Sequence, residues 1–223
     1  QTVVIDNGDG LIKAGFAGSD SPTTVFSTRI GKSKENTFIG NFKENDLMDI
    51  SYPIERQTIK NWEDMEIIWK YTFDKLGIKS EEHPLLITEH PLNPKVQREK
   101  TAQVLFEKFN VPALYMGISC VLSLYSHGST TGIVIDCGYS STTTIPIENG
   151  YPLPGGIKKL DIGGRDISNY LLKLLQEKGY NYDDSHINLI NDIKEKTGFV
   201  ALDYEREIEK GNLNEITYGL PDG

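Results

Sequence analysis

Two short apolar runs that each end in an aspartate are the most distinctive pattern along the chain. The first, at residues 2–6, is followed by a Gly-rich tetrad and by a second apolar stretch at 11–16. The other, at 131–136, is followed in the same way by residues 137–140 and by a run at 141–147. Apolar runs separated by a short Gly-rich segment are typical of β-hairpins. The repeat predicts two related α/β lobes, each opening with a strand–loop–strand element.

Apolar residues spaced three and four apart predict helices between the two hairpins. The clearest spans 62–76, and Asn61 is a suitable N-cap ahead of it. The next is expected to begin at Pro94, as the first helical residue behind Asn93, and to end near Phe109. The first of these segments places Trp62, Met65, Ile68, Trp69 and Leu76 on one face.

Further helices and strands complete the pattern. Helices are expected at 117–126, at 166–178 with Gly179 as its stop, and at 186–197 between Ser185 as cap and Gly198 as terminator. Strands are expected at 84–88 and 113–116. Because strands alternate with helices, the fold class is α/β.

Residues 31–49 have the weakest pattern, with lysines and glutamates scattered among small polar residues. We expect an exposed and mobile excursion from the first lobe there. No low-complexity linker separates the lobes, so they are expected to pack together rather than to be tethered.

Composition and charge exclude several classes of protein. The chain is 38% apolar and 25% charged, as ordinary globular domains are. It has no run of 18 apolar residues, so no membrane span is expected. The net charge of −9 argues against direct binding of nucleic acid. Cys120 and Cys137 lie in apolar stretches, which favours two reduced, buried thiols over the alternative of a single disulfide.

The loops of the two hairpins have residues suited to holding a phosphate. In the first, the glycines let backbone amides approach an anion, and Lys13 adds a positive charge. Asp6, at the end of its strand, is placed to hold the hydration shell of Mg²⁺. Taken alone, this loop is better explained as a plain Gly-rich hairpin. The matching loop after Asp136 favours a pair that grips a polyphosphate and a metal from two sides.

Many strings in the chain resemble actin and the actin-related proteins, within the wider class that includes sugar kinases and Hsp70 ATPase domains. These strings are DNG at 6–8, extending to Gly10, KAGFAG at 13–18, YPIE at 52–55, NWEDM at 61–65, PLNP at 91–94, FNVPA at 109–113, LSLY at 122–125, TTGIV at 130–134, GRD at 164–166, DIKEK at 192–196 and LPDG at 220–223. The similarity runs from end to end and in register.

The resemblance implies an actin-like ATPase fold with a nucleotide cleft between two lobes. The first lobe would span 1–126, with a small excursion subdomain at about 28–51. The second lobe would span 127–223, with 163–223 as its outer subdomain. Actins continue further than Gly223, so the chain is expected to cover the N-terminal part of the fold and to lack the C-terminal part.

The resemblance also implies ATP or ADP with Mg²⁺ as cofactors. Asp6 and Asp136 would bind Mg²⁺ through water. The residues implied to contact the nucleotide are Asp9, Gly10, Leu11, Lys13, Gly138, Tyr139, Ser140, Ser141, Gly164, Lys194 and Glu195.

Several positions in this implied site depart from actin. Asp9 replaces a serine of the first loop, and Tyr139-Ser140 replaces an Asp-Gly pair of the second. Ser119 stands where actins have the glutamine that positions the attacking water, and Thr143 where they have an assisting histidine. Hydrolysis needs a positioned water and stabilised charge, so we expect actin-type ATP hydrolysis to be weak or absent.

Two more departures concern assembly. Between Gly31 and Phe38 the excursion is shorter than in actins, where this segment inserts into the neighbouring subunit. Before Gln57, Arg56 takes the place of a modified histidine.

The resemblance therefore favours a divergent actin-related protein, acting as a structural subunit of a cytoskeletal filament or of a larger dynactin-like, axonemal or chromatin complex. Its partners would be actin or actin-related subunits, and its location the cytoplasm and cytoskeleton, with the nucleus as the alternative. A polymerising actin with ATPase activity is the second interpretation. A kinase or chaperone of the same fold is disfavoured, because the matching strings are specific to actins.

Overall fold

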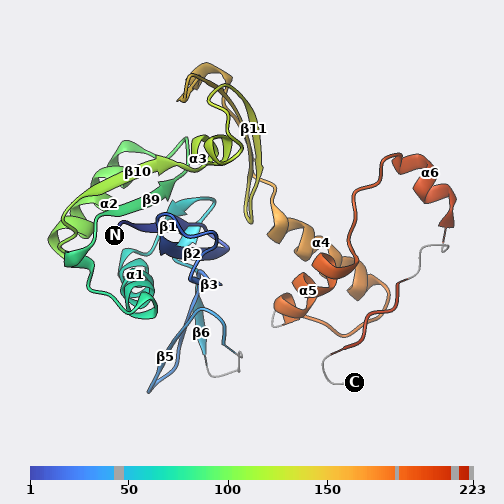
Figure 1. Ribbon diagram of the computed structural model, residues 1–223. Coiled ribbons are helices and arrows are strands. Elements are labelled where there is room, and N and C mark those ends of the chain that lie inside the picture. Colours follow the sequence, from blue (N-terminus) through green and yellow to red (C-terminus); the bar gives the residue numbers. More distant parts are fainter. Residues whose placement is uncertain (43–47, 184–185, 212–215, 221–223) are drawn as a thin grey trace. The chain divides into compact units, whose positions relative to one another are not determined.

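The computed structural model describes residues 1–42, 48–183, 186–211 and 216–220. Within them the chain divides into two compact units, 1–164 and 165–223, which are described separately (Figure 1). The first unit contains both strands and helices, as the α/β prediction requires, whereas the regular elements of the described part of the second unit are helices.

The main sheet of the first unit contains both strands of the first predicted hairpin. Its strand order is β10-β9-β1-β2-β3. The strands are β1 (Val3–Asn7), β2 (Leu11–Phe16), β3 (Thr24–Ser27), β9 (Leu85–Glu89) and β10 (Leu114–Ile118). β1, β9 and β10 are parallel, so their carboxyl ends lie at one edge of the sheet. In open sheets with parallel strands, ligands commonly bind at this edge.

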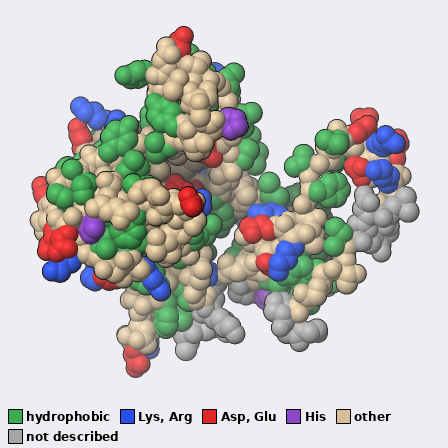
Figure 2. Space-filling model, viewed as in Figure 1, with side chains coloured by type: hydrophobic (Ala, Val, Ile, Leu, Met, Phe, Trp, Pro, Cys, Tyr) green, Lys and Arg blue, Asp and Glu red, His purple; other side chains and the backbone are tan. Residues whose placement is uncertain are grey.

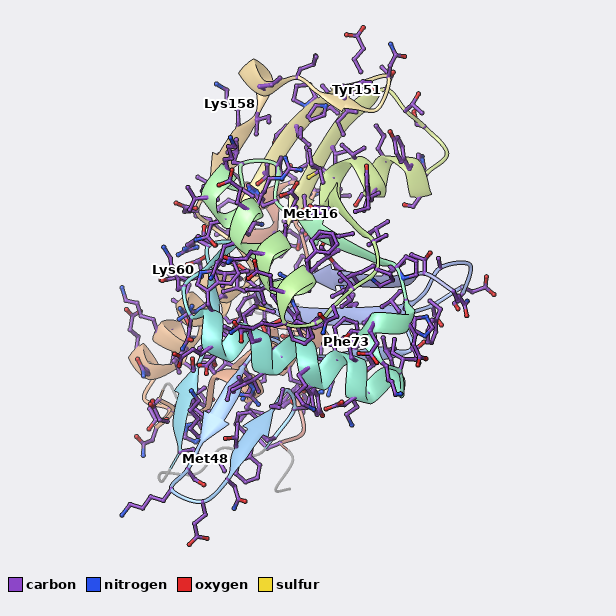
Figure 3. All side chains as sticks on the ribbon, turned by 90° about the vertical axis from the view of Figure 1, so that its left-hand side faces the viewer. Met48, Lys60, Phe73, Met116, Tyr151 and Lys158 are labelled. Atoms are coloured by element: carbon purple, nitrogen blue, oxygen red, sulfur yellow. The ribbon has the colours of Figure 1, made fainter. Side chains whose placement is uncertain are left out.

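Helices α1 (Trp62–Leu76) and α2 (Lys95–Glu107) cover one face of this sheet (Figure 3). α1 begins where predicted, because the Asn61 side chain accepts a hydrogen bond from the Asp64 N–H at 3.1 Å. It ends at Gly77, whose φ of 68° is left-handed. α2 corrects the prediction slightly: Pro94 is its N-cap, and the helix starts one residue later.

The segment expected to be an exposed, mobile excursion contains a small antiparallel sheet within the described residues. The strands are β4 (Ile30–Lys32), β5 (Thr37–Ile39) and β6 (Asp49–Ser51). Buried Arg29 organises the segment by donating hydrogen bonds to the carbonyls of Gly40 at 3.1 Å and Phe42 at 3.0 Å. Strands this short carry too little alternation to detect. The expected mobility around 43–47 lies outside the described residues.

A short hairpin lies between the small sheet and α1, and a 3₁₀ turn lies between α1 and β9. β7 (Ile54–Glu55) and β8 (Thr58–Ile59) form a hairpin whose turn residues, Arg56 and Gln57, have φ values of 47° and 66°. A 3₁₀ turn, η1 (Ser80–Glu82), precedes β9.

The second predicted hairpin forms a sheet of its own in the same unit. It contains β11 (Gly132–Cys137), β12 (Thr142–Glu148), β13 (Tyr151–Pro152) and β14 (Lys158–Leu160), with the 3₁₀ turn η2 (Pro154–Gly156). Helix α3 (Ser119–Ser126) packs on one face through a cluster of Cys120, Val121, Leu124, Ile145 and Ile147. The expected helix start at 117 was wrong, because 117–118 end β10.

The two cysteines differ in exposure, because Cys120 lies on α3 and Cys137 ends β11. Both are free thiols, and Cys120 is buried as expected. Cys137 is exposed, so the expectation that both are buried was wrong for this residue. Successive side chains of β11 point to opposite faces, and because Asp136 points inward, Cys137 points outward.

The second unit contains α4 (Gly164–Glu177), which begins at the last residue of the first unit, α5 (Ile187–Thr197) and α6 (Tyr204–Glu209). α4 and α5 are joined by a hydrogen bond of 2.9 Å from Ser168 Oγ to Asn191 Oδ1. Gly179, with φ of 89°, lies just beyond α4 as predicted. Much of the expected apolar stripe of α4, including Ile167 and Tyr170, is exposed. The predicted cap Ser185 lies outside the described residues.

Candidate functional site

The first loop, residues 6–13, ties its metal-binding candidate to the parallel edge of the main sheet. Asp6 Oδ1 accepts a hydrogen bond from Thr88 Oγ1 at 2.8 Å, and Asp6 Oδ2 pairs with Lys13 Nζ at 3.2 Å. Thr88 Oγ1 in turn accepts from the Asn7 N–H at 2.9 Å. Lys13 reaches Asp6 because the two residues are opposite each other in the β1–β2 register. The Asp6 carboxylate is therefore held in one position between a hydroxyl and a cation.

The second loop, residues 136–143, presents its aspartate in a similar way. Asp136 lies opposite Thr143 on β11 and β12, so the two side chains share a face. Its Oδ2 accepts a weak hydrogen bond from Cys120 Sγ at 3.8 Å. Burial raises the pKa of Asp136, and the negative charges of Asp6 and Asp9 raise it further, whereas Cys120 and Lys13 lower it. Carboxylates of both loops are thus close enough to interact.

The two loops touch each other directly. Ser140 Oγ donates a hydrogen bond to Asp9 Oδ2, and both residues are buried. Next to this contact, a Cβ at Gly10 would lie 2.7 Å from Cβ and Cγ of Tyr139. Because heavy atoms do not approach so closely, glycine is required at position 10 for the Tyr139 ring to fit. Five residues that the resemblance implies for phosphate binding, Asp9, Gly10, Tyr139, Ser140 and Ser141, therefore come together.

His90, just beyond β9, binds Thr143 and was not found from the sequence. The Leu92 N–H donates to His90 Nδ1 at 3.1 Å, so in the neutral ring Nε2 carries the proton and donates to Thr143 Oγ1 at 2.9 Å. Burial, with the nearby charge of Lys159, lowers the pKa of His90 to about 4, which keeps the ring neutral at pH 7. The position of His90 at the carboxyl end of a parallel strand was a usable signal.

Ser119 opens α3 directly after β10, at the same edge of the main sheet. Its hydroxyl lies 4.0 Å from Cys120 Sγ, and its carbonyl accepts from Ser123 Oγ at 3.0 Å. Thr143 is fully buried. Ser119 and Thr143, which the resemblance puts at the water-positioning places, are therefore short side chains that lie against neighbouring residues.

Arg56 binds the backbone of the second loop. Its Nη1 donates to the carbonyl of Ser140 and, at 3.0 Å, to that of Asp161. Lys159 Nζ then donates to the Arg56 carbonyl at 3.1 Å. The sequence singled out Arg56 as a departure from actin, but these contacts depend on pairing across more than 80 positions and were not foreseen.

The remaining predicted residues fall into two groups. The Gly138 N–H donates to Ser141 O at 2.9 Å within the second loop, and the Gly164 N–H, at the start of α4, donates to Gly138 O at 3.0 Å. Leu11 starts β2 and is 43% exposed.

Lys194 and Glu195 lie on α5 in the second unit, where both bind Asn191. Burial lowers the pKa of Lys194. The residues of the two loops therefore come together in the first unit, and Lys194 and Glu195 belong to the second unit.

The donor set fits a divalent cation with phosphate oxygens. Asp6 and Asp136 offer the hard oxygen ligands that Mg²⁺ prefers, and Mg²⁺ commonly uses one or two carboxylates together with phosphates. Ser141 Oγ is buried and makes no hydrogen bond within the described part of the chain, so it is an unused donor. Asp9 is the exception, because a carboxylate repels phosphate.

Comparison with known proteins gives one result. A family profile described as actin matches residues 1–223. In addition, none of the helices in the described ranges has the length and hydrophobicity needed to cross a lipid bilayer. Acidic and basic side chains are interspersed on the faces visible in Figure 2.

Proposed function

Because the chain belongs to the actin family and has a mixed α/β structure consistent with that fold, we propose that it is a divergent actin-related structural subunit. Proteins of this family generally bind ATP or ADP with Mg²⁺ and assemble with other subunits. In this proposal the protein belongs to a cytoskeletal filament or a larger multiprotein assembly, and holds Mg-ATP or Mg-ADP between its lobes with slow hydrolysis. It acts in the cytoplasm and cytoskeleton, or alternatively in the nucleus.

The observation that carries the proposal is the direct contact between the two aspartate-bearing loops. Ser140 binds Asp9 across the site, and Asp6 and Asp136 interact electrostatically from the two sides. The two hairpins, β1–β2 and β11–β12, belong to separate sheets. This separation supports a lobe boundary near 126/127. The nucleotide phosphates would lie between the loops.

Each residue of the site has a defined task in this proposal. Asp6 and Asp136 would order the cation through water, and Lys13 would offset phosphate charge from the first loop. Ser141 would donate its unused hydroxyl to a phosphate oxygen. When bound, the cation neutralises negative charge on the phosphates.

Slow hydrolysis is supported by the state of the two replaced side chains. Thr143 is occupied by the Nε2–H of His90, and the Ser119 hydroxyl lies beside Cys120. Neither is long enough to take over the reach of glutamine or histidine. Without a group that orients the attacking water, the transition state loses much of its stabilisation.

Sedimentation of the purified protein with and without Mg-ATP tests the structural role. We expect the same oligomeric state, or the same association with a fixed partner, in both conditions. Polymerisation that requires Mg-ATP and is accompanied by phosphate release would instead support the polymerising ATPase and contradict the proposal.

A further inference from the structure

Asp9 carries a negative charge into the place where the resemblance puts the terminal phosphate of a nucleotide. The residue is 8% exposed, and Ser140, whose hydroxyl donates a hydrogen bond to it, is 4% exposed. Ser140 Oγ donates its hydrogen bond to Asp9 Oδ2. A hydroxyl on the opposite loop that would be suited to a phosphate oxygen is therefore already bound to a carboxylate of the protein itself.

The charges around Asp9 leave little capacity for a further anion. Burial and the negative charges of Asp6 and Asp9 raise the pKa of Asp136, so these two carboxylates act on a third. The cation that opposes them, Lys13, is already paired with Asp6 at 3.2 Å. A divalent cation would balance these carboxylates together with a short phosphate chain, whereas each added phosphate would meet Asp9 at close range.

The second loop is fastened in the position that makes this contact. Arg56 donates to the carbonyl of Ser140 and to that of Asp161, and the Gly164 N–H donates to Gly138 at 3.0 Å. On the other side, the Tyr139 ring lies against Gly10. Moving Ser140 away from Asp9 to admit a larger ligand would disturb several of these contacts together.

One donor remains unused beside the closed contact. Ser141 Oγ is completely buried and has no hydrogen-bond partner in the described part of the chain. A buried hydroxyl without a partner is unfavourable unless a ligand supplies an acceptor. The site therefore combines a saturated position at Ser140 with an unsatisfied one at Ser141.

We propose that the Asp9 carboxylate is a built-in substitute for a terminal phosphate, so that the site accepts a nucleoside diphosphate with a divalent cation and discriminates against the triphosphate. This inference rests on the proposed function, because it assumes that the two loops bind a nucleotide. It adds the identity of the ligand and a residue that determines it. Ser141 provides the hydrogen bond for the diphosphate, and Asp9 excludes the further phosphate by charge.

The test is direct titration of Mg-ADP and Mg-ATP by calorimetry. The wild-type protein is expected to bind Mg-ADP at least about tenfold more tightly than Mg-ATP. Asp9→Asn keeps the shape of the side chain but removes its charge, and Asp9→Ser also removes its bulk. Both are expected to strengthen ATP binding about tenfold or more and to change ADP binding only slightly. Having two variants keeps the test valid if one fails to fold, which circular dichroism reveals.

Two controls separate charge from other effects. Asp20→Asn removes the same charge at an exposed turn and is expected to leave the ADP preference unchanged. Ser140→Ala removes the hydrogen bond but keeps the Asp9 charge, and is expected to retain the preference. If Ser140→Ala abolishes the preference as fully as Asp9→Asn, Asp9 acts by fastening the loops, and the charge-based inference is overturned.

The remaining outcomes distinguish this inference from the proposed function. If wild type and both Asp9 variants bind ADP and ATP equally well, the site is a nucleotide site without discrimination, and only the inference fails. If none of the three proteins binds either nucleotide, the proposed nucleotide cleft fails, and the inference fails with it.

Discussion

His90 binds Thr143 in the candidate site, and this contact was not predicted from the sequence. Its neutral ring is oriented by the Leu92 N–H and donates to Thr143, the position at which the resemblance implies a histidine in actins. An imidazole is thus present beside Thr143, and it comes from the residue that follows β9 rather than from β12. A hydrogen bond between residues 53 positions apart cannot be read from a local pattern.

His90 is expected to make stability depend on pH. Its pKa falls from 6.5 to about 4 on folding, so between these values the unfolded chain binds a proton that the native state does not. The stabilisation is complete above pH 6.5 and is lost as the pH falls toward 4. Because the ring is only half-buried, we expect a loss of about 1 kcal/mol between pH 7.5 and pH 5.

Urea unfolding of the wild type and of His90→Gln at these two pH values measures this contribution. Glutamine also donates to Thr143 but does not titrate, so the other groups of the protein, including Asp136, cancel in the comparison. An equal change in the free energy of unfolding for both proteins would contradict the assigned pKa shift.

Asp64 on α1 connects a helix to the small sheet of the excursion. Its side chain is fully buried and accepts hydrogen bonds from Lys32 Nζ at 2.5 Å, Ser51 Oγ at 2.5 Å and Asn61 Nδ2 at 2.8 Å. Lys32 lies on β4 and Ser51 on β6, so one carboxylate holds two strands and a helix N-terminus together.

Asp64→Ala is therefore expected to lower the free energy of unfolding by about 3 kcal/mol, because it leaves a lysine and two hydrogen-bonding groups without their partner. Asp74→Ala on the same helix is the matched control, since Asp74 forms only an exposed pair with Lys70 and should cost less than about 1 kcal/mol. Denaturant unfolding compares the two. Similar losses would show that Asp64 does not join the elements.

Helices and strands were predicted correctly where neighbouring residues carry a clear pattern, and were missed where the pattern is short. The helix at 62–76 was confirmed because a regular apolar stripe begins at a capping asparagine and ends at a glycine. Both hairpins were found from an apolar run, an aspartate and a glycine. The small sheet was missed because its strands are three residues long and its order depends on Arg29 and Asp64, which make contacts far along the chain.

For the site, the sequence predicted that residues of the two loops would act together, and the structure brings Asp9 and Tyr139 to Ser140 and Gly10. The roles of these residues stay predictions. Three neighbours bind residues of the two loops: Thr88 binds Asp6, His90 binds Thr143 and Arg56 binds Ser140. These neighbours come from separate strands and turns. Their contribution became visible only from the sheet order, which places the carboxyl end of β9 beside that of β1.

At the scale of the whole molecule, the chain belongs to the actin family. The resemblance implies that its water-positioning residues differ from those of actins. The family match extends over residues 1–223, and the loops keep their paired aspartates. The central claim is that this architecture has been retained for assembly, while the turnover of nucleotide has been lost or slowed.

Single-turnover phosphate release from Mg-ATP, measured beside an ordinary actin under the same conditions, tests that claim most directly. The loss of both water-positioning side chains predicts release at least about 100-fold slower than that of actin. A rate within about threefold of actin would contradict the account, because it would mean that Ser119 and Thr143, or their neighbours, still position the attacking water.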